Sequence, residues 1–158
     1  MSSASQNPEE LRDLYRELIL DHARSPRHFG KLDGMTHSAE GINPLCGDKL
    51  RMYFKLNSAG KMIDDVRFEG TGCAISVASA SLLAETVKGM SVADAETYFS
   101  AVMTTLTGDK NPRPAVDLGK IRALEGVRDF PSRVKCATLA WHAMHSALSN
   151  DGTTATTE

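Results

Sequence analysis

Three cysteines are the residues of this sequence best suited to chemistry: Cys46, Cys73 and Cys136. Three thiols cannot all pair within one chain, which leaves buried structural cysteine, metal ligand or reactive nucleophile as their roles. Cys46 lies in Asn-Pro-Leu-Cys-Gly-Asp, where the glycine allows its sulfur and the Asp48 carboxylate to turn toward one point. A shared metal ion requires that arrangement.

The other two cysteines are predicted at the beginnings of helices. Cys73 follows Gly70 and Gly72, which end a strand, and Cys136 lies in the first turn of the last predicted helix beside Lys135. The positive end of a helix dipole and a neighbouring cation both lower the pKa of a thiol, toward the thiolate that binds metal and attacks sulfur. A single cysteine is more often a buried core residue, but three cysteines at element boundaries favour ligands or nucleophiles.

The elements that position these thiols follow from the periodicity of apolar residues. From Asn7, with Pro8 at the first helical position, the sequence predicts a helix that Pro26 ends. Alternating apolar residues between Thr36 and Glu69 predict an antiparallel meander of about three strands. Helices are predicted over 73–89, 91–106, 120–124 and 134–148. The predicted class is α+β, with the sheet preceding most of the helices.

Length and composition limit the organisation and the partners of the chain. Its 158 residues are 41% hydrophobic, enough to bury the core of one domain, which we expect over 8–148. The ends, 1–7 and 149–158, are polar and are expected to be flexible. The net charge of −2, without a basic stripe, argues against nucleic acid as a partner. No stretch has the roughly 20 apolar residues of a membrane span or the pattern of a signal peptide, so we expect a cytoplasmic protein without a membrane partner.

The sequence around each cysteine resembles a known family. The three contexts are NPLCGD at 43–48, GTGCAIS at 70–76 and SRVKCATLAW at 132–141. In this order they resemble the U-type iron-sulfur cluster assembly proteins, the IscU and SufU family, also described as NifU N-terminal-like. The opening LYRELILDHARSPRHFG is similar too, and the resemblance runs from about Leu14 to Leu148.

Two features favour the SufU branch of that family over the scaffold branch. The scaffold branch has a histidine immediately before the third cysteine, and this sequence has Lys135 there. The SufU branch also carries additional sequence between the second and third cysteines, which the passage from about Thr104 to Pro131 supplies.

The resemblance implies a fold and a metal centre. The fold would be the U-type α+β fold, a small antiparallel three-stranded sheet with helices packed on one side. One Zn²⁺ would be bound by Cys46, Asp48, Cys73 and Cys136, because three thiolates and one carboxylate complete the tetrahedral shell that zinc prefers. Arg133 and Lys135 are auxiliary candidates that could stabilise the thiolates or hold a partner, although basic residues before a helix are commonly just solvated.

The resemblance also implies a reaction. Cys46 would be the nucleophile that takes the outer sulfur of a persulfide on a SufS-type cysteine desulfurase and carries it toward a downstream iron-sulfur scaffold complex. This is a zinc-dependent sulfurtransferase. Two alternatives stay open: a scaffold that assembles a transient iron-sulfur cluster on the same cysteines, since thiolates bind either metal, and a purely structural zinc site.

Overall fold

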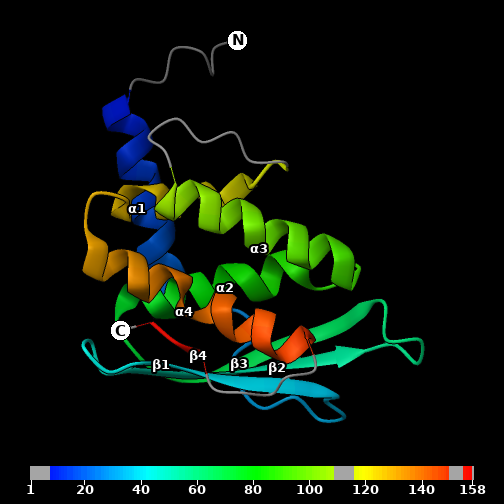
Figure 1. Cartoon of the computed structure of the whole chain (residues 1–158). Coiled ribbons are helices and arrows are strands. Elements are labelled where there is room, and N and C mark those ends of the chain that lie inside the picture. Colours follow the sequence, from blue (N-terminus) through cyan, green and yellow to red (C-terminus); the bar gives the residue numbers. More distant parts are fainter. Residues whose placement is uncertain (1–7, 109–115, 150–154, 158) are drawn as a thin grey trace.

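The computed structural model describes residues 8–108, 116–149 and 155–157 of the chain (Figure 1). The elements follow one another as α1 (Pro8–Arg24), β1 (His37–Asn43), β2 (Asp48–Leu56), β3 (Ile63–Thr71), α2 (Ala74–Val87), α3 (Val92–Thr107), the 3₁₀ helix η2 (Gly119–Val127), α4 (Pro131–Leu148) and β4 (Ala155–Thr156). The predicted helices and the three-stranded meander are confirmed. Asn7, the predicted cap of the first helix, lies outside the described residues.

The sheet has four strands in the order β3-β2-β1-β4. Strand β2 pairs with β1 and with β3 in antiparallel fashion, as predicted. The prediction of three strands is wrong, because β4 pairs with β1 in parallel, Gly41 opposite Ala155, and makes the sheet mixed. Within the predicted flexible end 149–158, residues 155–157 are thus held by the sheet edge, where the Thr157 N–H also donates to the Ile42 carbonyl at 3.1 Å.

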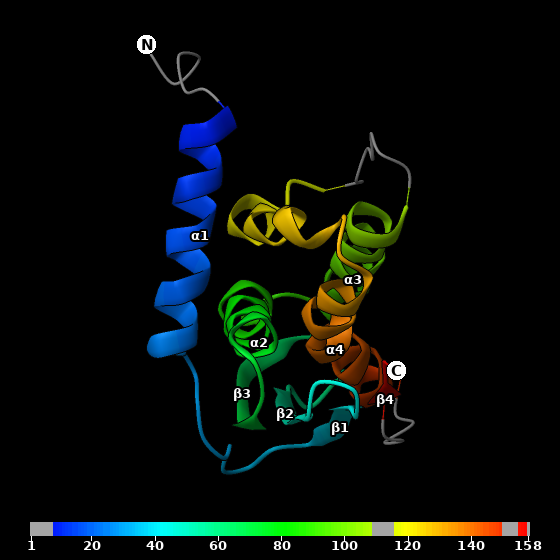
Figure 2. The same cartoon turned by 90° about the vertical axis from the view of Figure 1, so that its left-hand side faces the viewer.

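All the helices lie on one face of the sheet, as Figures 1 and 2 show. Helices α2 and α4 pack directly on the strands, and α1 and α3 pack on those two helices from outside. The alternation in β2 explains this arrangement, because its apolar residues turn toward the helices while Lys49, Arg51 and Lys55 turn away. The fold class and the placement of the helices are confirmed. In the described part of the chain, no helix has the length and apolar character needed to cross a membrane.

The contact between α2 and α4 is fixed by two linked hydrogen bonds, which are buried within an apolar core. Trp141 has no exposed surface, and its indole Nε1–H donates to Ser79 Oγ at 3.1 Å. The Ser79 hydroxyl in turn donates to the Ala137 carbonyl at 2.6 Å. Because Ala137 and Trp141 belong to α4 and Ser79 to α2, this chain of hydrogen bonds sets the position of the helix that carries Cys136.

Trp141→Phe is expected to lower the free energy of unfolding of the metal-free protein by about 1–3 kcal/mol, through lost volume and a lost hydrogen bond. Urea denaturation measures this change. Ser79→Ala and the double variant complete a mutant cycle, in which the two losses should be clearly less than additive. Strictly additive losses would show that the indole hydrogen bond contributes nothing.

Candidate metal centre

Cys46 lies at the tip of the turn between β1 and β2, with its side chain exposed. Its N–H donates to the Asn43 carbonyl at 3.3 Å and so closes the turn. Gly47 has a φ of +73°, a conformation that favours glycine, and the chain reverses there into β2. The predicted placement of this thiol on a glycine turn is confirmed.

Asp48 is the first residue of β2 and is only 1% exposed. Its Oδ1 accepts the Cys73 N–H at 2.8 Å, which joins the start of β2 to the start of α2. Among the described residues no basic side chain forms a salt bridge with this carboxylate. A buried carboxylate without a counter-charge is costly, so the position favours a bound cation.

Cys73 is the N-cap residue of α2, as the glycines before it predicted. Its sulfur accepts the Ser76 N–H at 3.5 Å, and the Ser76 hydroxyl donates to the Cys73 carbonyl at 3.0 Å. This thiol therefore lies at the positive end of a helix dipole.

Cys136 differs from the prediction in its position and in its acidity. Helix α4 begins at Pro131, so this cysteine lies in the second helical turn and not the first. It is 2% exposed, and burial raises the pKa of its thiol far above the usual range, with further increases from Asp48, Cys46 and Cys73. The prediction of a lowered pKa is therefore wrong for Cys136 in the metal-free chain, and a metal ion would have to displace its proton.

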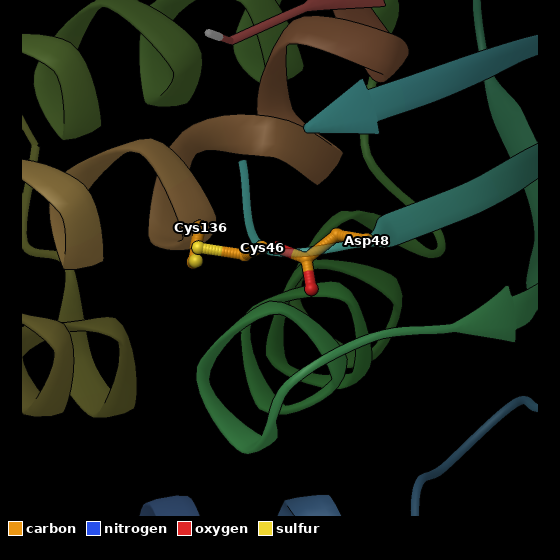
Figure 3. A group of neighbouring side chains, drawn as sticks. All are labelled: Cys46, Asp48 and Cys136. Atoms are coloured by element: carbon orange, nitrogen blue, oxygen red, sulfur yellow. The ribbon is translucent and has the colours of Figure 1, made fainter. Parts of the chain in front are cut away.

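The described part of the chain contains one group of three potential metal ligands, formed by Cys46, Asp48 and Cys136 (Figure 3). Their ligand atoms all lie within 4.8 Å of one another. Cys73 is not a member of that group, but its backbone holds Asp48 and its thiol is close enough to raise the pKa of Cys136. Two thiols, a third beside them and one buried carboxylate fit the sulfur and oxygen ligands of zinc. No histidine joins this group.

A comparison of the sequence with models of protein families identifies the family of this chain. The model described as NifU-like N terminal domain matches residues 14–150. The chain belongs to the NifU-like N-terminal domain family. This family includes the IscU and SufU proteins, so the relationship predicted from the three cysteine contexts is confirmed.

Relatives of this NifU-like chain carry both functional names of the family. The zinc-dependent sulfurtransferase SufU of Bacillus subtilis strain 168 is 39% identical over 138 residues, which are 87% of this chain and 91% of that protein. The iron-sulfur cluster assembly scaffold protein IscU of Streptococcus pyogenes serotype M1 is 37% identical over 139 residues, 88% of this chain and 85% of that protein. The chain is thus a SufU-type member of an iron-sulfur cluster assembly family.

A solved structure agrees with that assignment. The crystal structure of an iron-sulfur cluster assembly scaffold protein for the SUF system, from Fervidobacterium islandicum AW-1, has a TM-score of 0.76 with 32% identity. The match covers 84% of this chain and 94% of the chain in that structure. The NifU-like N-terminal protein from Brucella abortus, 24% identical with a TM-score of 0.78, shares the fold.

The described contacts of the two auxiliary candidates of this NifU-like chain are made outside the ligand group. Arg133 is exposed, and its guanidinium lies 4.5 Å from the centre of the Phe130 ring. Lys135 is half-buried and lines a cavity of about 560 Å³ together with Thr138 and His142. Neither forms a described hydrogen bond or ion pair with the three ligands. A role in the thiolate cluster gains no support from these contacts.

Asn43 belongs to the site although the sequence did not single it out. It is the last residue of β1, fully buried, and its Nδ2 lies 3.5 Å from both Asp48 Oδ2 and Cys136 Sγ. Its place in NPLCGD, three residues before Cys46, was the available signal. A polar residue before Pro44 is also typical of an ordinary turn, so the pattern did not distinguish Asn43 as a residue of the site.

Proposed function

We propose that this chain is a zinc-dependent sulfurtransferase that accepts persulfide sulfur from a SufS-type cysteine desulfurase for iron-sulfur cluster assembly. The unequal exposure of the grouped ligands carries this proposal. Cys46 is exposed, whereas Asp48 and Cys136 are 1% and 2% exposed. A persulfide on a partner protein can reach an exposed thiol, while buried groups suit a permanent anchor. A sulfur acceptor needs one thiol that can exchange and other ligands that keep the metal in place.

The residues divide between holding the metal and carrying the sulfur. Asp48, Cys73 and Cys136 would hold Zn²⁺ with Cys46 as the fourth ligand, and the bound ion would keep the thiols deprotonated. The hydrogen bond from the Cys73 N–H fixes the Asp48 carboxylate, so this ligand is held from outside the turn that carries Cys46. The Cys46 N–H closes the exposed turn, and its thiol lies beside that of Cys136.

The transfer step conserves electrons. The Cys46 thiolate attacks the outer sulfur of the desulfurase persulfide, and a new S–S bond forms on Cys46. The S–S bond on the desulfurase breaks, and its cysteine leaves as a thiolate. No external oxidant or reductant is needed, and the sulfur is available for a downstream iron-sulfur scaffold complex. Free thiols at all three cysteines fit a cytoplasmic site of action, where they stay reduced.

The alternative function is a scaffold on which a transient iron-sulfur cluster is assembled. Relatives named as scaffolds are 37% and 38% identical to this chain, and thiolates are ligands of both iron and zinc. Lys135, in place of a histidine before Cys136, favours the sulfurtransferase.

Metal analysis combined with a desulfurase assay separates the two functions. Protein purified without added metal should contain about one zinc per chain and should increase the turnover of cysteine by a SufS-type desulfurase. Stoichiometric iron and sulfide, with visible absorption and no increase in turnover, would establish the scaffold instead. Zinc without any increase in turnover would leave a structural metal site.

A further inference from the structure

Asn43 touches every member of the ligand group. Its side-chain Nδ2 lies 3.5 Å from Asp48 Oδ2 and 3.5 Å from Cys136 Sγ, and its backbone carbonyl accepts the Cys46 N–H at 3.3 Å. It is opposite Asp48 in the β1–β2 pairing, while Cys136 is 93 residues away in sequence and comes from α4. This residue therefore joins the hairpin to the helix at the point where the ligands meet.

The two kinds of contact act differently on the ligands. The amide group touches Asp48 and Cys136, whereas the described contact with Cys46 is made by the main chain. The amide NH₂ is a donor, and an ionised carboxylate and a thiolate are pure acceptors. The opposite orientation of the amide would place its oxygen against the Asp48 carboxylate and repel it. The donors of Asn43 are therefore committed to the two buried ligands.

Stability of the fold alone does not explain an asparagine at this position, because its side-chain oxygen is unpaired in the described part of the chain. Asn43 Oδ1 is buried and has no hydrogen-bond partner among the described residues. A buried carbonyl oxygen without a partner costs free energy, and a residue selected for stability alone would have both ends satisfied. An asparagine placed here with its oxygen unpaired fits a role in arranging ligands, since hydrogen bonds from neighbouring residues orient metal ligands and tune the metal.

We propose that Asn43 is a positioning residue of the metal centre, which fixes Asp48 and Cys136 as permanent ligands and leaves the Cys46 side chain free to exchange. This inference rests on the metal site of the proposed function. It explains how a single turn can hold one ligand rigidly at Asp48 and another loosely at Cys46, two residues earlier.

The test is zinc affinity, measured by competition with a chromophoric chelator, for wild type, Asn43→Ala and Asn43→Asp. Loss of such an outer hydrogen bond is expected to weaken zinc binding by about 10-fold to 100-fold. Asn43→Asp should weaken it more than Asn43→Ala, because it places a second carboxylate beside Asp48. Asn57→Asp is the matched control: it makes the same change in the β2–β3 turn, where the Asn57 Oδ1 accepts from Lys61 and Met62. Its zinc affinity should equal that of wild type.

A second measurement distinguishes positioning from stability. With Co²⁺ in place of zinc, the absorption bands report ligand geometry, and they should shift in Asn43→Ala but not in Asn57→Asp. Urea denaturation of the metal-free proteins shows whether the variants fold. If Asn43→Asp does not fold, Asn43→Ala decides.

The outcomes separate this inference from the proposed function. If wild type binds zinc and Asn43→Ala matches it in affinity and in the Co²⁺ spectrum, Asn43 has no positioning role and the sulfurtransferase proposal stands. If Asn43→Ala loses stability without a spectral change, its role is structural and the inference is wrong. If wild type itself binds no zinc, the proposed function fails first and the inference with it.

Discussion

A Cys46→Ala protein is expected to lose all stimulation of the desulfurase, because Cys46 is the exposed thiol of the site. Cys73 is half-buried and caps α2, and Cys136 is buried in α4. Zinc binding should weaken but persist, since Asp48, Cys73 and Cys136 remain. Desulfurase turnover and the zinc content of the purified protein measure the two effects separately.

The location of the transferred sulfur gives the stricter form of this prediction. After reaction with the desulfurase and cysteine, mass spectrometry of alkylated peptides should find the persulfide on Cys46 of the wild type. Leu45→Ala is a suitable control, because Leu45 is the neighbouring residue of the same turn and is 72% exposed. Its persulfide should also be on Cys46. A persulfide on Cys73 or Cys136, or normal turnover with Cys46→Ala, contradicts the assigned acceptor.

Gly70→Ala is expected to destabilise the metal-free protein by about 3–5 kcal/mol, a large effect for one methyl group. Gly70 has a φ of +132°, where other residues are strained. A Cβ added there would overlap the Lys49 carbonyl oxygen and lie 2.9 Å from Leu50 Cα. Because these contacts are with backbone, β2 and β3 would have to separate at the end that holds Asp48 against Cys73.

Urea denaturation measures this loss, with Gly60→Ala as the matched control. Gly60 also has a positive φ, +71°, but a Cβ there would meet nothing within 4 Å. Gly60→Ala should lower the free energy of unfolding by only about 1–2 kcal/mol, the penalty for a left-handed conformation. If Gly70→Ala folds, its zinc affinity should also fall. Equal losses in the two variants would show that the close approach of β2 and β3 at Gly70 is unimportant.

Local sequence was sufficient for much of the fold. The alternation of Leu50, Met52 and Phe54 predicted β2, and Pro8 and the residues after it predicted α1, because these patterns depend on neighbours within one element. Strand β4 was missed because its two residues have no periodicity of their own. They are held by backbone hydrogen bonds to β1, which every residue except proline can make on both sides.

The sequence by itself determined the types of candidate ligand and the local setting of Cys46 and Cys73, since a glycine turn and a helix start are encoded within a few residues. Tertiary structure decided how the ligands meet and how they differ. Only the packing of α4 on the sheet brings Cys136 to Asn43, 93 residues away, and buries it so that the pKa of its thiol rises. Burial depends on everything that surrounds a side chain. No local pattern around Cys136 could therefore predict that it is the buried cysteine of the group and Cys46 the exposed one.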